Sequence, residues 1–228
     1  MTDTAYADLA PLLRRMSGDE KHDWSALSTL DVLWVLYDRV LRVPPDRLDD
    51  PDRDRFLLSK GHGPMAFYAV LAAKGFLDPS TLDTWAEFGS PLGRHPDRVL
   101  VPGAEIGSGS LGHGLAIGVG QAFGVRSRGA GVVVLVGDGE LDEGSNHEAI
   151  AVAGRFGLDN LTAVVVDNHN ADHGWPGGIE TRFTVENWAS AVVPGRDHDA
   201  LHAAFTSSHP GRPLVVVADI DAELEGDR

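Results

Sequence analysis

The sequence contains no cysteine among its 228 residues. Disulfide bonds, a thiolate nucleophile and a cysteine-ligated metal site are therefore excluded. Basic residues are also scarce, with 19 Lys and Arg against 34 Asp and Glu and a formal net charge of −15. A nucleic acid or an anionic membrane needs a basic face on its partner, so we expect neither. A phosphorylated cofactor remains compatible with this charge, because backbone amides and a metal ion can bind it.

Long apolar runs are missing as well. No stretch reaches the roughly 18 consecutive apolar residues of a membrane-spanning helix. The N-terminus, MTDTAYADLA, has neither the basic stretch nor the apolar core of a secretory signal. We therefore expect a cytoplasmic protein. The chain is long enough for one large buried core and shows no internal repeat or linker, so we expect residues 1–228 to form one domain.

Short apolar runs alternate with helical patterns along the chain. The runs GVVVLV and LTAVVV have no polar alternation, which is typical of strands buried on both faces. Strands are expected over 131–136, 161–166 and 214–218. Helices are expected over 5–16, 25–41, 64–74, 79–88, 111–123, 145–157 and 198–208, with an irregular loop over 89–109. The order predicts an α/β fold, an open, mainly parallel sheet with helices on both faces.

Polar residues follow the first two of these strands. Asp138 lies in the turn Gly137-Asp138-Gly139, and Asn168 follows the second strand. Ligands of open α/β sheets bind beyond the carboxyl ends of the strands, where a carboxylate and an amide oxygen suit Mg²⁺. Gly139 offers a backbone N–H at a helix N-terminus, which stabilises a phosphate. The alternative is a tight turn and a strand-end cap without a ligand, but the two residues together favour a metal and phosphate site.

GDG followed some thirty residues later by Asn resembles the signature of thiamin-diphosphate enzymes, and further segments narrow the resemblance to transketolases. These segments are LSKGHG (58–63), GRHP (93–96), GSGSLGHG (107–114), GDGELDEGSNHEA (137–149), DNHNADHG (167–174) and GRDHDAL (195–201). They keep the family order between about residues 20 and 218. The resemblance implies the thiamin-diphosphate-binding fold, with thiamine diphosphate and Mg²⁺ as cofactors.

The resemblance also assigns the residues that bind these cofactors. Asp138 and Asn168 would bind the metal through their side chains, and Asn170 through its backbone carbonyl. Gly139 would face the diphosphate. The loop on the aminopyrimidine side is assigned to Gly109, Ser110 and Leu111.

Three histidines are implied to act on the substrate. His62 would lie near the cofactor and the substrate, and His95 near the hydroxyl end of the donor. His22 matches a third family histidine, although the Pro-Gly-Gly turn that follows it in the family is absent here. His113 stands where the family usually has Gln. The alternative is that each histidine is a structural residue, and we would favour that interpretation if the surrounding motifs were absent.

Glu143 and Glu148 match two family glutamates near the interface between paired active sites, where they would relay protons. The alternative is a solvated acidic helix start, which the helix dipole favours on its own.

The resemblance implies transfer of a two-carbon ketol unit from a ketose or ketose phosphate to an aldose or a carrier-bound acceptor. In transketolases the glutamate that activates the cofactor belongs to a separate pyrimidine-binding domain. The sequence ends at Arg228 without a second strand and helix series, so we expect that domain on a partner subunit in an α2β2 assembly. The glycine-rich segment 111–123 would belong to the contact surface, because glycines allow another chain to approach closely.

Two other functions remain open. The α subunit of a 2-oxo-acid dehydrogenase shares the GDG and Asn pattern, but that class lacks the SKGHG and GRHP segments. A catalytically degenerate, regulatory partner is the non-enzyme alternative. Both metal ligands and both motif histidines are retained, which argues against it.

Overall fold

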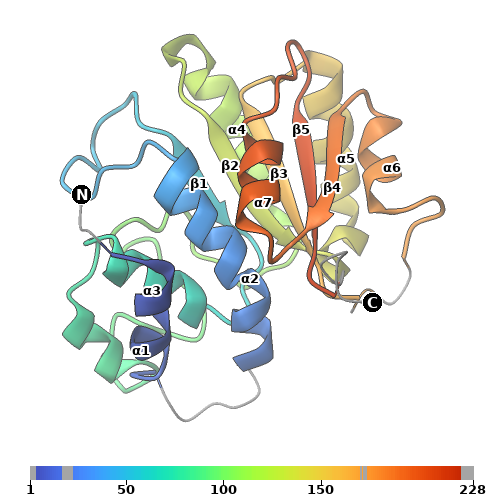
Figure 1. Ribbon diagram of the computed structural model, residues 1–228. Coiled ribbons are helices and arrows are strands. Elements are labelled where there is room, and N and C mark those ends of the chain that lie inside the picture. Colours follow the sequence, from blue (N-terminus) through green and yellow to red (C-terminus); the bar gives the residue numbers. More distant parts are fainter. Residues whose placement is uncertain (1–3, 17–22, 170, 172–173, 222–228) are drawn as a thin grey trace.

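A single parallel sheet of five strands organises the chain (Figure 1). The computed structural model describes residues 4–16, 23–169, 171 and 174–221. The strand order is β1-β2-β3-β5-β4, and each neighbouring pair is parallel. The strands are β1 (Arg55–Leu58), β2 (Val132–Gly137), β3 (Leu161–Asp167), β4 (Ala189–Pro194) and β5 (Leu214–Asp219). The predicted fold class is confirmed.

The central strands are buried on both faces because their side chains supply two separate cores. In β2, Val133 and Leu135 belong to one hydrophobic cluster, whereas Val132, Val134 and Val136 belong to the other. Successive side chains of a strand point to opposite faces. An unbroken β-branched run therefore serves both cores at once, which is why these strands show no alternation in sequence.

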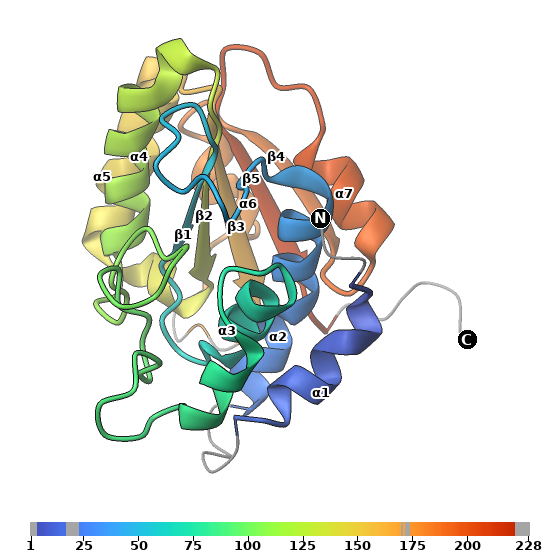
Figure 2. The same ribbon diagram turned by 90° about the vertical axis from the view of Figure 1, so that its left-hand side faces the viewer.

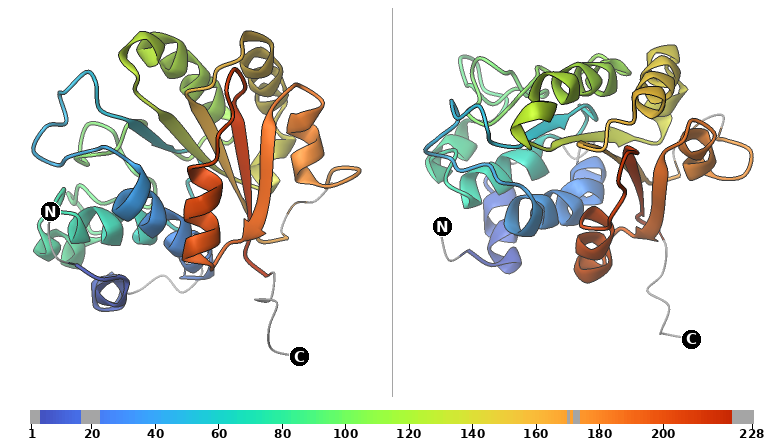
Figure 3. Two further views of the ribbon diagram at one scale, coloured as in Figure 1. Left: turned by 45° about the horizontal axis from the view of Figure 1, so that its top comes forward. Right: turned by 90° about the horizontal axis from the view of Figure 1, so that it is seen from above.

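Helices cover both faces of the sheet (Figures 2 and 3). One layer contains α1 (Leu9–Leu13), α2 (Asp23–Val35), α3 (Met65–Ala73) and α7 (His198–Phe205). The other contains α4 (His113–Val125), α5 (Gly144–Phe156) and α6 (Ile179–Thr184). Short 3-10 turns span Tyr6–Asp8, Pro79–Thr84, Arg126–Arg128 and Gly139–Asp142, and a π turn spans Leu36–Val40. In the part of the chain described, no helix has both the length and the apolar character needed to cross a membrane.

Three elements escaped the sequence prediction: β1, β4 and α6. Strand β1 has only four residues and is flanked by charged residues, so it shows no periodicity. Strand β4 lies at an edge of the sheet and ends at Pro194, a residue tolerated only at such an edge. Helix α6 has six residues. Strand β1 and helix α6 are too short for a pattern of their own. Strand β4 is as long as β2, but none of its residues is fully buried and it lacks the unbroken apolar run that marks β2. Pairing or packing with neighbours creates all three elements.

Three predicted helices are less regular in the structure than expected. The helix expected over 79–88 is a 3-10 turn over Pro79–Thr84. The helix expected over 25–41 ends as an α-helix at Val35 and continues as a π turn. The helix expected over 5–16 is a turn at Tyr6–Asp8 followed by the short α1.

Helix α4 uses its glycines in two ways. A Cβ at Gly118 would lie nearer than 3.0 Å to Cγ2 of Val134, and one at Gly114 nearer than 3.0 Å to Cβ of Ser59. These two glycines let the helix pack closely on its own sheet. A Cβ at Gly120 or Gly124 would instead meet nothing within 4 Å. Of the four glycines in this helix, only Gly120 and Gly124 could therefore serve the predicted contact with another chain.

Candidate active site

Asp138 and Asn168 lie beyond the carboxyl ends of adjacent strands. Gly137 of β2 is in register with Val166 of β3, so the residues after them emerge side by side at one edge of the sheet. The Asp138 side chain is buried, and its Oδ2 accepts a hydrogen bond of 3.0 Å from the backbone N–H of Ala171. The loop after Asn168 is thereby folded back onto Asp138. The neighbourhood predicted from the sequence is present.

The donor set at this edge suits a hard cation. A carboxylate and an amide oxygen are ligands that Mg²⁺ accepts. Among the described residues no group of three His, Cys, Asp or Glu side chains can hold a metal ion. A cation at Asp138 and Asn168 would complete its coordination with backbone oxygens, water or a bound diphosphate. The residues therefore fit a magnesium diphosphate, with the turn Gly139–Asp142 beginning directly after the carboxylate. Asn170 lies outside the described residues.

Three loops converge beside this pair of residues. They are the segments 59–63 after β1, 93–96, and 107–112 before α4. The N–H of Ser108 donates to the carbonyl of Pro96 at 3.1 Å. A Cβ at Gly61 would lie 2.8 Å from the backbone nitrogen of Gly109, so glycine is required where the first and third loops touch. Segments separated by about fifty residues thus form one surface.

His62 and His95 face each other across these loops. Their ring centroids are 5.7 Å apart, and both residues are exposed. A Cβ at Gly109 would lie 3.0 Å from Cδ2 of His95. The structure therefore brings the two predicted histidines to one place, next to the predicted aminopyrimidine loop. Both imidazoles are thus exposed to solvent at this place.

The loop of Gly109, Ser110 and Leu111 begins at one glycine with positive φ and is followed by another. Gly109 has φ of +118° and Gly112 of +82°, which other residues rarely adopt. The hydroxyl of Ser108 is buried and has no hydrogen-bond partner in the described part of the chain. It is one of seven such atoms among the described residues, and it lies directly before the loop assigned to the cofactor.

The remaining predicted residues that the structure describes lie on the surface around the site. Glu143 precedes α5 and Glu148 lies in its second turn, and both side chains are exposed. A Cβ at Gly112 would lie 2.6 Å from Cβ of Glu143, so this glutamate borders the aminopyrimidine loop. His113 is the first residue of α4 and is exposed. His22 lies outside the described residues.

A buried pair of charges lies beneath the site, and the sequence prediction missed it. Lys60 and Glu140 are 8% and 4% exposed. Burial lowers the pKa of Lys60 to about 8, although Asp138 and Glu140 both act to raise it. Burial raises the pKa of Glu140, while hydrogen bonds from Ser59, Gly112 and Gly137 and the charge of Lys60 act in the opposite direction. Each charge thus partly compensates the cost of burying the other.

His169 is held between two carboxylates at the same edge of the sheet. Its Nδ1 lies 3.4 Å from Oδ1 of Asp167, and its Nε2 lies 3.3 Å from Oδ1 of Asp219. The charges of Asp167 and Asp219 raise the pKa of His169. Burial raises the pKa of Asp167. His169 has φ of +57° and turns the chain immediately after Asn168.

Little in the sequence marks Lys60 and Glu140 as buried residues of the site. Lys60 and Glu140 stand inside the segments LSKGHG and GDGELDEG, but in sequence they look like ordinary surface charges. Asp and Glu are abundant in this chain, and nothing local distinguishes a buried carboxylate from a solvated one. Their importance follows only from burial and from partners that are distant in sequence.

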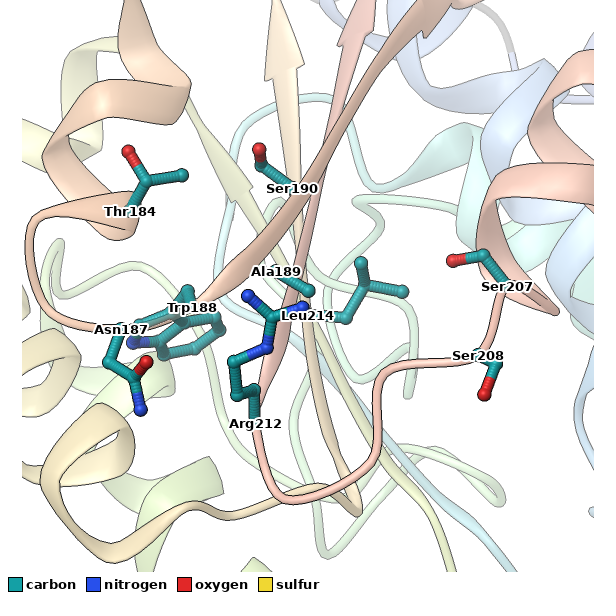
Figure 4. Close-up of a pocket in the computed structure, with 9 residues that line it drawn as sticks. All are labelled: Thr184, Asn187, Trp188, Ala189, Ser190, Ser207, Ser208, Arg212 and Leu214. Atoms are coloured by element: carbon teal, nitrogen blue, oxygen red, sulfur yellow. The ribbon is translucent and has the colours of Figure 1, made fainter.

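A concavity of about 540 Å³ lies at the amino-terminal ends of strands β4 and β5 (Figure 4). It is lined by Thr184, Asn187, Trp188, Ala189, Ser190, Ser207, Ser208, Arg212 and Leu214. Ala189 and Leu214 begin β4 and β5, whereas Asp138 and Asn168 follow strand ends. The concavity is therefore separate from the site and contains none of its predicted residues.

Comparisons with known proteins identify the family and the fold. The family described as transketolase, thiamine diphosphate binding domain, matches residues 16–220. The chain is 46% identical over 194 residues to a Phocaeicola vulgatus protein named as one of the subunits of apulose-4-phosphate transketolase, covering 82% of this chain and 69% of that protein. It superposes on a solved transketolase mutant from Pichia stipitis with a TM-score of 0.82 and 25% identity, over 94% of this chain and 35% of that one.

Another relative carries a different kind of name. The chain is 56% identical over 222 residues to a Rhodococcoides fascians protein named ferredoxin fas2, covering 96% of this chain and 73% of that protein. An iron–sulfur cluster of the usual kind needs cysteine ligands, and the present sequence has none. The chain thus corresponds to about a third of the solved transketolase and to roughly seven-tenths of these two relatives.

Proposed function

The chain belongs to the transketolase family of thiamine diphosphate-binding domains, and from this membership we propose that it is the cofactor-binding subunit of a ketol-transferring enzyme. The enzyme moves a two-carbon ketol unit from a ketose or ketose phosphate to an aldose or a carrier-bound acceptor. The 2-oxo-acid dehydrogenase alternative is not favoured, because the family that matches is the transketolase one. In this proposal residues 1–228 act as one diphosphate-binding domain, and the enzyme is cytoplasmic.

The observation that carries the proposal is the placement of Asp138 and Asn168 after neighbouring strands, beside the two facing histidines. In the proposed site these two side chains hold Mg²⁺, together with the backbone carbonyl of Asn170. The backbone N–H of Gly139 binds the diphosphate. When bound, thiamine diphosphate supplies an electron sink for cleavage of a carbon–carbon bond.

The chain's own side chains then orient the substrate. His62 and His95 are exposed and face each other, so they can bind hydroxyl or carbonyl oxygens of a ketose and shield them from water. Gly109, Ser110 and Leu111 pack against the aminopyrimidine side. His22 serves the acceptor end. Glu143 and Glu148 pass protons between paired sites, a role supported by the position of Glu143 beside Gly112.

A separate pyrimidine-binding subunit supplies the activating glutamate in this proposal. Two observations support it. The relative from Phocaeicola vulgatus is named as one subunit of its transketolase rather than as the whole enzyme. The exposed stripe of α4 also carries no charge, although the whole chain has a net charge of −15. The stripe consists of Ala116, Ile117, Gly120, Phe123 and Gly124.

The neighbouring helix extends this apolar surface. Phe156 of α5 is 56% exposed and contacts the exposed Phe123 of α4 with ring centroids 5.2 Å apart. Val152 of α5 is also exposed. An apolar surface on a strongly acidic chain fits a permanent protein contact. We propose an α2β2 assembly built on it, because the paired sites are related by two-fold symmetry.

The test is reconstitution with a candidate pyrimidine-domain subunit. The two chains are purified separately and together, and ketol transfer is followed by mass spectrometry with Mg²⁺, thiamine diphosphate and a panel of ketose phosphates. Activity is expected only from the mixture, with loss on chelation of the metal. Parallel reactions with 2-oxo acids identify the alternative class. Full activity from this chain in isolation would contradict the two-subunit proposal.

A further inference from the structure

Glu140 joins three parts of the site although it does not line it. Glu140 belongs to the turn Gly139–Asp142, and its side chain is buried. Its Oε1 accepts hydrogen bonds from the hydroxyl of Ser59 and from the backbone N–H of Gly112, the latter at 2.9 Å. Its Oε2 accepts from the N–H of Gly137 at 3.4 Å. One carboxylate therefore binds three donors that come from three different segments.

Each donor belongs to a segment that carries site residues. Ser59 begins the loop that contains His62. Gly112 ends the loop of Gly109, Ser110 and Leu111. Gly137 precedes the metal ligand Asp138. Ser59 extends the connection further, because its Oγ accepts a hydrogen bond of 3.1 Å from the N–H of Gly114 at the start of α4.

We propose that Glu140 is the positioning residue of this site: its buried carboxylate fixes the His62 loop and the aminopyrimidine loop against the Gly137-Asp138 turn. The inference rests on the proposed function for the identity of the ligand. The geometry of the three loops stands independently of that identity. Nothing in this role requires Glu140 to touch cofactor or substrate.

The chemistry of the connection requires a carboxylate of this length. A carboxylate is purely an acceptor and can bind all three donors. In Gln the NH₂ group would face one donor, and the neutral amide oxygen that remains is a weaker acceptor than the charged carboxylate for Ser59 and Gly112. An Asp side chain is shorter by one carbon–carbon bond, about 1.5 Å, and cannot reach Ser59 and Gly112 together from the same backbone. Ser59 donates its hydroxyl proton to Glu140, because a carboxylate can only accept, and the Ser59 oxygen at the same time accepts from Gly114.

The chain offers a matched control at the other end of the same two strands. Asp54 is 6% exposed, close to the 4% of Glu140. It accepts from the backbone N–H groups of Arg42 and Gly131, each at 2.8 Å, and from the Arg42 guanidinium. Asp54 thus connects segments just before β1 and β2, remote from the site. Asp54→Asn should perturb a buried carboxylate network without affecting the loops.

The experiment compares Glu140→Gln, Ser59→Ala and Asp54→Asn with the wild type by hydrogen exchange and cofactor titration. Exchange is followed on the full chain, and thiamine diphosphate with Mg²⁺ is titrated into the complex with the partner subunit. In Glu140→Gln we expect exchange of peptides over 107–115 to accelerate about tenfold and cofactor affinity to weaken about tenfold. A tenfold change corresponds to loss of one hydrogen bond to a charged acceptor.

The variants separate positioning from general stability. Ser59→Ala should act in the same direction as Glu140→Gln and carries the test if the latter does not fold. Asp54→Asn should lower the melting temperature while exchange over 107–115 and cofactor affinity stay within about twofold of wild type. If Glu140→Gln and Ser59→Ala resemble Asp54→Asn in all three measurements, Glu140 only stabilises the fold and the inference is wrong.

Failure of this inference can be distinguished from failure of the proposed function. If the wild-type complex does not bind thiamine diphosphate at all, the proposed function is wrong. The exchange measurement on the chain alone still decides whether Glu140 orders the loops. If the wild type binds the cofactor and Glu140→Gln binds it equally well with unchanged loop exchange, only the positioning role fails.

Discussion

Alanine at Gly120 should make the isolated chain more stable. The residue lies inside helix α4, and a Cβ there would meet nothing within 4 Å. Glycine in a helix interior costs about 0.5–1 kcal/mol relative to alanine, because it loses more backbone freedom on folding. With no clash to offset this gain, Gly120→Ala should stabilise the chain by about 0.5–1 kcal/mol. For a chain of this length, 1 kcal/mol corresponds to about 2–4 °C in melting temperature.

The same substitution at Gly118 should have the opposite sign. A Cβ at Gly118 would lie nearer than 3.0 Å to Cγ2 of Val134 in the buried strand β2. Overpacking of a core by a single methyl group typically costs about 1–3 kcal/mol. Gly118→Ala therefore serves as the control, with the same chemical change in the same helix and the opposite expected result.

The assay has two parts. Urea unfolding of the isolated variants gives their stability, and sedimentation of mixtures with the partner subunit gives their affinity for it. We expect Gly120→Ala to stabilise the chain and to weaken association, because the added methyl group holds the partner away from the helix. A stabilised variant that associates normally would refute the idea that this glycine is kept for a partner. A destabilised one would refute the packing argument itself.

Three further predictions concern the site and the core. Asp138→Ala should abolish Mg²⁺-dependent binding of thiamine diphosphate in calorimetry while the far-UV spectrum stays unchanged, and affinity that does not depend on a chelator would exclude this metal site. Alanine at His62 or His95 should lower kcat while stability changes by less than about 0.5 kcal/mol, because both side chains are exposed; normal turnover with a large loss of melting temperature would make them structural. Gly154→Ala should cost roughly 3 kcal/mol or more in urea unfolding, since its Cβ would lie nearer than 3.0 Å to the carbonyl oxygen of Glu186. An unchanged midpoint would show that α5 shifts freely.

The sequence alone determined the fold class and the chemical character of the site edge. The runs that form β2, β3 and β5 are apolar on both faces, so they could be assigned without any tertiary knowledge. Asp138 and Asn168 follow two of these strands directly, and parallel strands end at the same edge. Both facts are local, because they depend on residues that are adjacent in the chain.

The tertiary structure decided which distant segments meet and which charges are buried. Strands β1 and β4 exist only through pairing with β2 and β5, since β1 is too short to show a pattern and β4 lacks an unbroken apolar run. His62 and His95 meet because Gly61 and Gly109 allow their loops to touch. Glu140 lies inside a recognisable motif, but its partners Ser59 and Gly112 are 81 and 28 residues away. The free energy of a hydrogen bond depends on burial and on the position of its partner, and for Glu140 both are properties of the folded chain rather than of any local stretch of sequence.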